Sequence, residues 1–578
     1  MDTQTKTKSE VKEKTRIMIS GAEAVVRSLL EEGVDLMFGY VGGAIMPVYD
    51  SLYDYQDQLK HVMVRHEQGA MHAAQAYARI SKKPGVCMAT SGPGATNLIT
   101  GLADAMLDST PLVCITGQVV SPMLGTDAFQ ETDILGVSMP VTKWNIQVTK
   151  PEEIPEAIAK AFFIARSGRP GPVLIDITKD AQVAELDYSY KKVTQIRSYI
   201  PYPKLDIEQI KQAADLINAA KKPYVLVGQG VLLSGAQEEF KEFVEKTGIP
   251  VGSTLLGLSA FPSNHPLFTG MLGMHGNYAP NFNTNESDLI IAIGMRFDDR
   301  VTGNVKTYAT QAKIIHIDLD AAEIDKNIKT DVAIVADAMQ ALQALIPLVN
   351  SNTHKEWLKT FSDLYNYEFE KVIKKDCYPT KGDIKMGEVI NILSEKTKGE
   401  AIIVTDVGQN QMAAARYYKY NKTQSFVTSG GLGTMGFGLP AAVGAQIAAG
   451  SERDVYAFIG DGGFQMTIQE LGTISQLNLK VKIILLNNNF LGMVRQWQDM
   501  FNEKRYAYTE LTNPDFITIA KGFGIDGKTI SKREEVDEAI DNLISFDGPF
   551  LLEVKVEKEA NVFPMVPAGG TVSKMILE

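Results

Sequence analysis

Cysteine is scarce in this chain of 578 residues, which holds only Cys87, Cys114 and Cys377. Their spacing is not that of a metal site, and the first two stand inside apolar stretches. We therefore expect buried, reduced thiols and no cysteine-ligated metal.

Long apolar runs and basic clusters are also missing. No uninterrupted apolar stretch is long enough to span a bilayer. Residues 1–14 are polar with acidic members, unlike a secretion signal or an Arg-rich transit peptide. The net charge is −12, from 57 basic and 69 acidic residues. We expect a cytoplasmic protein that binds neither nucleic acid nor membrane.

What the chain does have is a steady alternation of short β-branched runs with helical stretches, which is typical of parallel sheets covered by helices. Its length exceeds what one core supports. We predict an α/β protein of three doubly wound parallel-sheet domains, at 15–185, 206–350 and 381–555. Residues 186–205 are predicted to form a linker, and 556–578, rich in Gly and Pro, to form a frayed tail or a lid.

Two apolar runs in the third domain end in polar residues. Asp461 follows Val455–Ile459, and Asn488 follows Val481–Leu486, while the period of the intervening segment 465–477 predicts a helix. A right-handed crossover brings such strand ends side by side at a ligand-binding edge. A carboxylate and an amide oxygen suit Mg²⁺, and a helix N-terminus suits a diphosphate. Gly460-Asp461-Gly462 alone is more often a surface turn, but the pair resembles the metal–diphosphate motif of thiamine-diphosphate (ThDP) enzymes.

Glu67 precedes a helical stripe of Ala70, Ala74, Tyr77 and Ala78. Its position alone allows two interpretations: a helix-terminal acid favoured by the dipole, or a buried acid with a partner. ThDP enzymes need one buried Glu that hydrogen-bonds the aminopyrimidine ring, and burial would keep that carboxyl protonated.

Glycine-rich turns follow several strands, at 39–43, 91–97 and 430–440. Each alone is more often a tight turn, but three at strand–helix junctions favour a cleft for a large cofactor. The segment 294–303 holds two Arg and two Asp directly after a strand, where self-paired salt bridges are the alternative to a binding role.

Together these segments resemble the acetohydroxyacid (acetolactate) synthase family, catalytic large subunit. The resemblance covers the chain beyond about residue 15 and is carried by Arg65–Ala70, Ser91–Asn97, Gly125–Glu131, Met271–His275, Arg296–Gly303, Asp406–Gln409, Gly431–Gly438 and Met493–Gln498. It implies a pyrimidine-binding, a central FAD and a diphosphate-binding domain. It also implies a homodimer or tetramer with active sites between subunits, and allows a small regulatory subunit.

The reaction implied is decarboxylation of pyruvate on ThDP and transfer of the two-carbon unit to pyruvate or 2-oxobutanoate. This is the first common step of branched-chain amino-acid biosynthesis. The implied cofactors are ThDP, Mg²⁺ and FAD, the last without net redox turnover.

The resemblance also assigns roles to residues. Mg²⁺ would be held by Asp461, Asn488 and the Phe490 carbonyl. ThDP would contact Gln409, Asn410, Gly433, Thr434, Met435, Gly462 and Gly463. Glu67, Gly42 and Gln130 would face the reacting centre, Arg300 would bind the second substrate's carboxylate, and Trp497 would favour 2-oxobutanoate. FAD would contact Arg169, Gly228, Gly230, Leu272, Gly273, Met274, His275, Arg296, Phe297, Asp298 and Asp318.

Several positions depart from the family pattern: Val41 replaces a proline, Val120–Pro122 a Pro-Arg-Arg-like segment, Asn410 a histidine, Ala413 a tryptophan and Ala568 a serine. A pyruvate oxidase or a catabolic, FAD-free acetolactate synthase remains an alternative, although 296–303 and Trp497 together argue against both. A non-catalytic scaffold would be expected to lose Glu67 or the Asp461/Asn488 pair. A simple flavin-binding protein leaves residues 460–488 unexplained.

Overall fold

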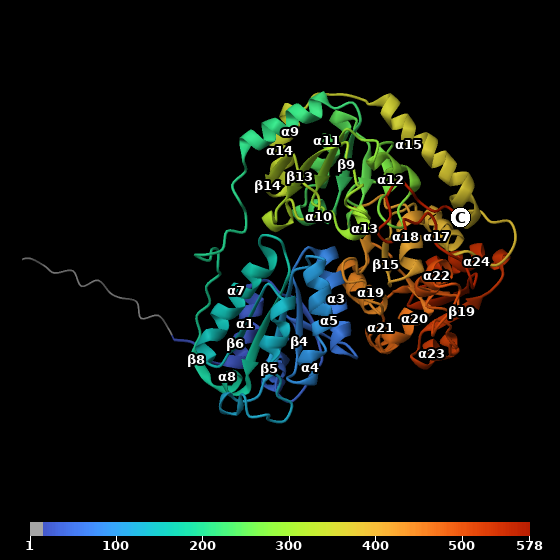
Figure 1. The fold of residues 1–578 in the computed structure, drawn as a ribbon. Coiled ribbons are helices and arrows are strands. Elements are labelled where there is room, and N and C mark those ends of the chain that lie inside the picture. Colours follow the sequence, from blue (N-terminus) through green and yellow to red (C-terminus); the bar gives the residue numbers. More distant parts are fainter. Residues whose placement is uncertain (1–15) are drawn as a thin grey trace, which may run out of the picture.

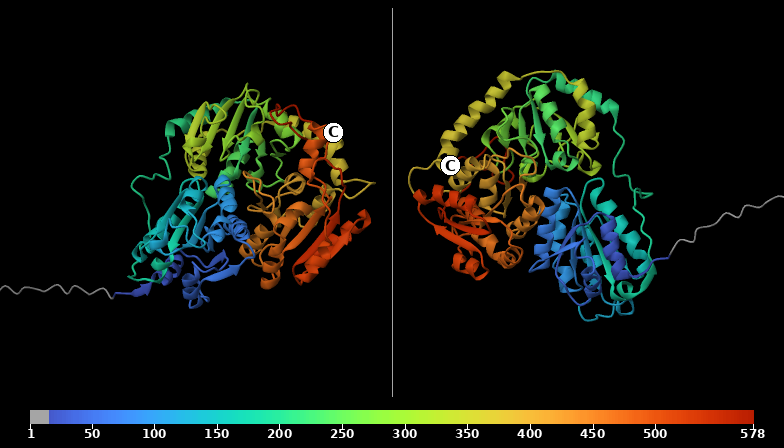
Figure 2. Two further views of the ribbon diagram at one scale, coloured as in Figure 1. Left: turned by 60° about the horizontal axis from the view of Figure 1, so that its bottom comes forward. Right: turned by 180° about the vertical axis from the view of Figure 1, so that it is seen from behind.

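The protein consists of three α/β lobes, each built on a six-stranded sheet (Figure 1). The structure, a computed structural model, describes residues 16–578. All three sheets are parallel, which confirms the predicted fold class. The lobes are arranged around a common centre, with the second above the first and third in the view of Figure 1 and likewise adjacent in Figure 2.

The first sheet has the order β3 (Lys60–Met63), β2 (Leu36–Gly39), β4 (Gly85–Ala89), β5 (Leu112–Gln118), β7 (Pro172–Thr178) and β6 (Trp144–Val148). Its central strands are buried throughout, as apolar runs covered by helices on both faces must be. The covering helices are α1 (Gly21–Glu31), α2 (Met46–Tyr53), α3 (Glu67–Ser81), α4 (Pro93–Thr96), α5 (Ile99–Leu107), α6 (Ile134–Ser138), α7 (Ile154–Arg166) and α8 (Lys179–Val183). Cys87 and Cys114 lie buried in β4 and β5, and Cys377 is also buried, all as free thiols.

The second sheet has the order β11 (Phe268–Met271), β10 (Val251–Ser253), β9 (Pro223–Val227), β12 (Leu289–Ile293), β13 (Lys313–Asp318) and β14 (Val332–Val335). Its helices are α9 (Ile207–Ala219), α10 (Gln229–Ser234), α11 (Gln237–Thr247), α12 (Tyr278–Thr284), α13 (Asp299–Thr302) and α14 (Ala338–Leu345). The carboxyl ends of β9, β12 and β13 face the other two lobes and carry the segments that line the cavity described below.

The third sheet has the order β16 (Phe426–Val427), β15 (Ile402–Thr405), β17 (Val455–Gly460), β18 (Lys482–Asn487), β20 (Phe550–Lys555) and β19 (Asp526–Ile530). Its helices are α17 (Met386–Lys396), α18 (Gln409–Tyr417), α19 (Gly438–Ala449), α20 (Asp461–Met466), α21 (Leu471–Leu477), α22 (Gly492–Phe501), α23 (Phe516–Gly522) and α24 (Val536–Ser545). The single helix predicted over 465–477 is wrong. Helix α20 ends at Met466, a 3₁₀ turn spans Ile468–Glu470, and α21 follows.

Helices α3 and α19 join the first and third lobes face to face (Figure 1). A Cβ at Gly444 of α19 would collide with the carbonyl oxygen of Ala73 in α3, so the two backbones meet at van der Waals distance. Apolar side chains of both lobes, from Met71 to Leu439, form one continuous core across this contact. The first and third lobes are therefore held as one unit.

The connecting segments are partly ordered. Residues 186–205 begin with the end of β8 (Glu185–Asp187), which pairs antiparallel with β1 (Met18–Ser20), and contain no further helix or strand. Helix α15 (Lys355–Glu368) runs along the outside of the second lobe toward the third (Figure 1) and continues through a π-helical turn, Phe369–Ile373, into α16 (Lys374–Cys377). The tail beyond 556 is irregular but lies on the second lobe, where Val566 N–H donates to the Met274 carbonyl oxygen at 2.8 Å. No helix of residues 16–578 combines the length and apolarity needed to cross a membrane.

Candidate active site

The ends of β17 and β18 bring Asp461 and Asn488 to one edge of the third sheet, as the sequence predicted. The strands pair in parallel, with Gly460 opposite Leu486. The Asp461 Oδ2 atom accepts a hydrogen bond from Asn513 Nδ2 at 2.7 Å, and the same amide donates to Asn487 Oδ1 at 3.0 Å. A loop distant in sequence therefore fixes the carboxylate at this edge.

Asn488 is connected to Gln409 at the N-terminus of α18. Its Nδ2 donates to Gln409 Oε1 at 3.3 Å, and its Oδ1 accepts from Phe490 N–H at 3.2 Å. Gln409 Nε2 in turn donates to Gln496 Oε1 at 3.2 Å and to the Ala560 carbonyl oxygen at 2.8 Å. Helix α22 and the tail thus complete the surroundings of this group.

The chemistry of these atoms fits a hard divalent cation. The donors are a carboxylate, an amide oxygen and a backbone carbonyl oxygen, which is the ligand class that Mg²⁺ takes. Burial raises the pKa of Asp461 to about 6, against the opposing effect of the Asn513 hydrogen bond. Within residues 16–578 no group of three or more His, Cys, Asp and Glu side chains is suited to a metal. A cation here would therefore need further oxygens from a ligand such as a diphosphate.

A glycine-rich loop, residues 430–438, lies beside the same edge. Asp406, fully buried, accepts hydrogen bonds from the N–H groups of Gly436 and Gly438 at 3.1 and 2.8 Å. A Cβ at Gly463 would collide with that carboxylate, so only glycine fits at this helix start. The hydroxyl of Thr434 is buried without a hydrogen-bond partner among residues 16–578, as expected for a group that faces a ligand.

Asn410 uses its amide inside the protein. Its Nδ2 donates to the carbonyl oxygens of Asp406 and Phe458 at 3.1 and 3.0 Å. A hydrogen bond from this amide to a diphosphate would have to displace one of them. Gly462 lies beside Met435 and Leu491, with the Met435 methyl 3.6 Å from the position of a Cβ.

Glu67, Gly42 and Gln130 come together at the carboxyl edge of the first sheet, around residues 90–94. Asn97 Nδ2 donates to Glu67 Oε2 at 2.9 Å. A Cβ added at Gly42 would stand 2.5 Å from Thr90 Cγ2, and one added at Gly92 would stand 2.6 Å from the Gln130 carbonyl oxygen. Glu67 is the first residue of α3 and is only partly buried within a single chain, whereas the role that the resemblance implies for it requires a buried carboxyl.

A cavity of about 850 Å³ lies where the three lobes meet. Its wall includes most of the predicted flavin contacts and, at the third lobe, part of the predicted ThDP and substrate contacts: Arg169, Gly230, Leu272, Gly273, Met274, His275, Arg296, Asp298, Arg300, Asp318, Gly433, Met435 and Trp497. A volume of this size holds a large organic cofactor.

The side chains around this cavity differ in whether they already have a hydrogen-bond or ion partner within the protein. His275 is buried, its Nδ1 has no partner among residues 16–578, and burial lowers its pKa to about 4, so it presents a neutral ring to a ligand. Arg169 already pairs with Asp320 and Glu323 at 3.1 and 2.7 Å. Two of the predicted flavin contacts, Phe297 and Gly228, lie outside the wall. Phe297 packs edge-on against Tyr308 and His316, and Gly228 is required by its close approach to the Gly294 backbone.

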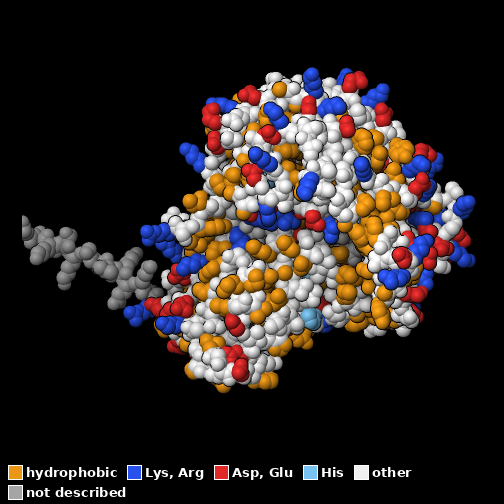
Figure 3. All heavy atoms as spheres, in the orientation of Figure 1, with side chains coloured by type: hydrophobic (Ala, Val, Ile, Leu, Met, Phe, Trp, Pro, Cys, Tyr) orange, Lys and Arg blue, Asp and Glu red, His pale blue; other side chains and the backbone are white. Residues whose placement is uncertain are grey.

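The Glu67 group and the Asp461 group remain separate in one chain. Among residues 16–578 no hydrogen bond connects them; Arg65 and Gly69 next to Glu67 instead contact Glu470. Exposed apolar side chains stand next to members of both groups: Val41 beside Gly42, Phe129 beside Gln130, and Met466 at the end of the helix that Asp461 begins. Figure 3 shows hydrophobic side chains gathered over the lower part of the molecule, the first and third lobes in Figure 1.

Sequence reasoning missed several members of this site. Asn513 stands in a Thr-Asn-Pro turn, and Asn97 ends a glycine turn. Nothing in the sequence around either residue indicates that its amide binds a carboxylate. Asp406 begins one of the segments that resemble the family, but that resemblance gave it no role of its own. A buried Asp directly after an apolar strand was the available signal.

Comparison with known proteins places these features in a family. Residues 19–137, 210–345 and 406–554 match, in order, the N-terminal thiamine pyrophosphate (TPP) binding, central and C-terminal TPP binding domains of thiamine pyrophosphate enzymes. The chain is 46% identical over 560 residues to the acetolactate synthase isozyme 2 large subunit of Escherichia coli (strain K12), covering 96% of this chain and 99% of that one. It is 47% identical to the acetolactate synthase large subunit of Corynebacterium glutamicum, over 96% of this chain and 90% of that one. It is also 47% identical to acetolactate synthase 2, chloroplastic, of Nicotiana tabacum, over 96% and 85%. The chain therefore belongs to the acetolactate synthase large-subunit family of thiamine-diphosphate-dependent carboligases.

Proposed function

We propose that this chain joins two molecules of pyruvate into 2-acetolactate with release of one CO₂, and pyruvate with 2-oxobutanoate into 2-aceto-2-hydroxybutanoate. The product supplies branched-chain amino-acid biosynthesis. The observation that carries the proposal is the buried Asp461–Asn488–Gln409 group at the third sheet edge, together with Glu67 at the first.

The proposed cofactors are ThDP and Mg²⁺ at the third sheet and FAD in the 850 Å³ cavity. ThDP supplies the electron sink that lets a 2-oxo acid lose CO₂. Asp461, Asn488 and the Phe490 carbonyl would hold Mg²⁺. The Glu67 carboxyl would donate a hydrogen bond to the aminopyrimidine ring, and Asn97, bound to its other oxygen, would orient it.

The second substrate would lie between Arg300 and Trp497, which both line the cavity. The Arg300 guanidinium is largely exposed, and within residues 16–578 Asp299 is its one ion partner, at 3.5 Å, so it is free to pair with a carboxylate. The Trp497 ring stacks against Phe501 at a centroid distance of 5.0 Å and offers an apolar wall for the extra methyl group of 2-oxobutanoate.

We further propose that the active site is completed by a second copy of the chain. The Glu67 and Asp461 groups of one chain do not meet, Glu67 is partly exposed, and exposed apolar side chains stand next to members of both groups. A second copy would cover these surfaces and set Glu67 of one chain against the ThDP of the other. A small regulatory subunit is compatible with this arrangement.

The test is pyruvate turnover with ThDP, Mg²⁺ and FAD, with acetolactate, acetate, peroxide and oxygen uptake measured together. We expect acetolactate without oxygen uptake, reduced at least about 100-fold in Glu67→Gln, because a lost proton-transfer group costs this much. Glu370→Gln, on an exposed turn, is the matched control and should retain full activity. Oxygen-dependent acetate as the main product would identify a pyruvate oxidase instead.

A further inference from the structure

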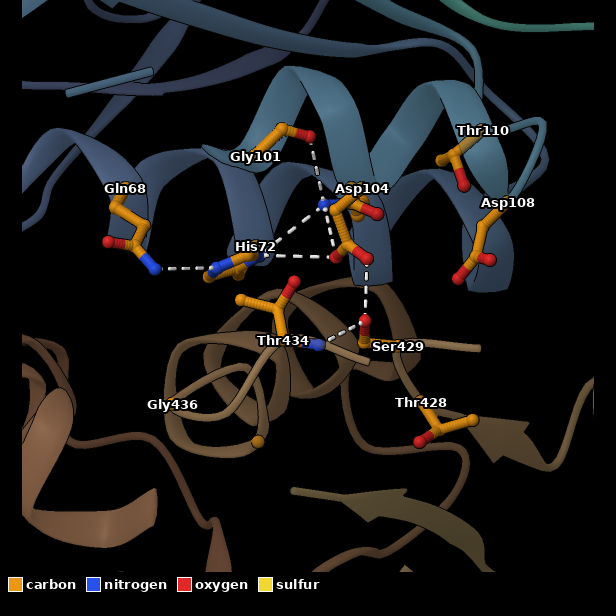
Figure 4. A network of polar contacts seen from close by, with 12 residues as sticks. Gln68, His72, Gly101, Asp104, Asp108, Thr110, Thr428, Ser429, Thr434 and Gly436 are labelled. Atoms are coloured by element: carbon orange, nitrogen blue, oxygen red, sulfur yellow. Dashed lines mark hydrogen bonds and ion pairs between the residues drawn. The ribbon is translucent and has the colours of Figure 1, made fainter. Parts of the chain in front are cut away.

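Helix α5 of the first lobe and the residue that caps its C-terminus present two carboxylates to the glycine-rich loop of the third lobe (Figure 4). Asp104 and Asp108 lie one turn apart and are both buried, although they belong to neither sheet edge described above. The loop that they contact carries Gly433, Thr434 and Met435, three of the residues expected to touch ThDP.

Asp108 fixes the beginning of the loop. Its two oxygens accept hydrogen bonds from the N–H groups of Gly430 and Gly431, at 2.8 and 2.6 Å. Arg79 of α3 pairs with the same carboxylate at 2.9 Å and donates its other nitrogen to the Thr428 carbonyl oxygen at 2.6 Å. Two helices of the first lobe therefore fix three consecutive peptide groups of the third.

Asp104 fixes the middle of the loop through a hydroxyl. Ser429 Oγ donates to Asp104 Oδ1 at 2.5 Å and accepts from Thr434 N–H at 2.9 Å. On its other side, Asp104 Oδ2 accepts from Gln75 Nε2 at 3.2 Å. The contact from Asp104 to Thr434 thus passes through one serine.

The two carboxylates are electrostatically unfavourable together, and Arg79, which pairs with Asp108, offsets only part of this cost. Burial, then the nearby Asp108 charge, raises the pKa of Asp104 to about 7. His72, 3.6 Å from Asp104, does not offset it, because burial lowers the pKa of His72 to about 3 and leaves the ring neutral. Two carboxylates four residues apart on a buried helix face repel each other. An apolar or amide pair would pack α5 at a lower free-energy cost. The presence of two carboxylates is therefore explained by their contacts with the loop and not by the packing of α5.

We propose that Asp104 and Asp108 are positioning residues for ThDP, which set the conformation of loop 430–436 before the cofactor binds. The inference rests on the proposed function of that loop. Gly433 has a φ of +66° and Gly436 of +88°, so the free loop has many alternative conformations and needs external contacts to hold one. The carboxylates supply those contacts from a separate lobe.

The test is the dissociation constant of ThDP, measured by calorimetry on the FAD- and Mg²⁺-loaded protein. We expect Asp108→Asn and Asp104→Asn each to weaken ThDP binding about 10-fold, while the KM for pyruvate at saturating ThDP stays within about twofold. Asp176→Asn is the matched control. That residue is equally buried, accepts three side-chain hydrogen bonds and lies away from the loop, so ThDP affinity should not change.

A double-mutant cycle separates positioning from general destabilisation. Ser429→Ala removes the link from the loop side with little change in volume, and its effect on ThDP affinity should not add to that of Asp104→Asn. Unchanged ThDP affinity in the variants, or fully additive effects, would overturn the inference while leaving the synthase activity intact. A wild-type chain that binds no ThDP would overturn the proposed function, and this inference with it.

Discussion

Asn513 and Asp461 are 52 positions apart in the sequence, yet the Asn513 amide donates to the Asp461 carboxylate at 2.7 Å. The same amide nitrogen bonds Asn487, so one side chain ties the ends of two neighbouring strands. We predict that Asn513→Ala raises the Mg²⁺ concentration needed for ThDP binding about 10-fold, since partners behind a metal ligand typically contribute this much. Titrating Mg²⁺ against bound ThDP measures it.

Asn391→Ala is the control for that change. Its amide also donates to a carboxylate, Glu395 at 2.9 Å, but on the exposed surface of α17. Its Mg²⁺ requirement should equal that of the wild type. An Asn513 variant that behaves like the Asn391 variant would show that Asp461 does not depend on this amide.

Arg300 is expected to recognise the carboxylate of the second 2-oxo acid. Arg300→Lys keeps the charge but loses the two parallel N–H donors, so kcat/KM should fall about 10- to 100-fold. The apparent melting temperature should not change, because the side chain is largely exposed. Steady-state kinetics over a pyruvate series measures this effect, and Arg197→Lys, exposed in the segment 186–205, is a control that should stay near wild-type values. A kcat/KM of Arg300→Lys equal to that of the wild type would show that Arg300 does not bind the substrate carboxylate.

Trp497 is expected to set the choice between the two second substrates. Trp497→Leu removes most of the apolar wall, so the ratio of 2-aceto-2-hydroxybutanoate to acetolactate in a mixed-substrate assay should fall about 10-fold. Phe501→Leu changes only the ring behind Trp497 and should leave that ratio within about twofold. A product ratio unaffected by Trp497→Leu would place specificity elsewhere.

Asp176 should contribute a pH dependence to stability. Burial raises its pKa from 3.8 to about 6, although three side chains donate to it. Between about pH 4 and about pH 6 the unfolded chain ionises here while the folded carboxyl stays protonated, so the free energy of unfolding falls as pH rises. The free energy of unfolding falls by about 3 kcal/mol over this pH range, because the pKa of the folded state lies about two units above that of the unfolded state.

Urea unfolding of the wild type and Asp176→Asn across this range measures the effect. The difference in unfolding free energy, wild type minus variant, should shrink as pH rises, because Asn does not titrate. Asp215→Asn, exposed on α9, should show a constant difference. A constant difference for Asp176→Asn as well would mean that its carboxyl ionises alike in both states.

The buried strands could be predicted because their apolar composition indicates a fully buried environment. Leu36–Gly39, Leu289–Ile293 and Lys313–Asp318 are short, largely apolar runs of the kind from which the sequence predicts parallel strands, and each forms one, since apolar runs fit a strand covered on both faces. Edge strands were missed. In Lys60–Met63 only Val62 is buried, and Asp526–Ile530 is mostly polar, so no apolar run marked either.

Long-range polar contacts could not be predicted for a different reason. Ser429 and Asp104 are 325 positions apart, and neither residue's neighbours indicate a carboxylate–hydroxyl contact. At the break between α20 and the 3₁₀ turn, Thr467 Oγ1 donates to the Gly436 carbonyl oxygen at 2.9 Å, a long-range contact that the continuing apolar period does not indicate. The proximity of Asp461 and Asn488 could be predicted because the register of the two parallel strands alone brings them together.

The contact of α3 with α19 at Ala73 and Gly444 has a genetic consequence. It binds the Glu67 half and the Asp461 half of a chain into one body, whereas the proposed active sites each draw those halves from different chains. Two defective alleles, Glu67→Gln and Asp461→Asn, would then rescue each other when expressed together. Half of the mixed dimer's sites would pair two intact halves, and cells that grow with neither allele alone would grow with both.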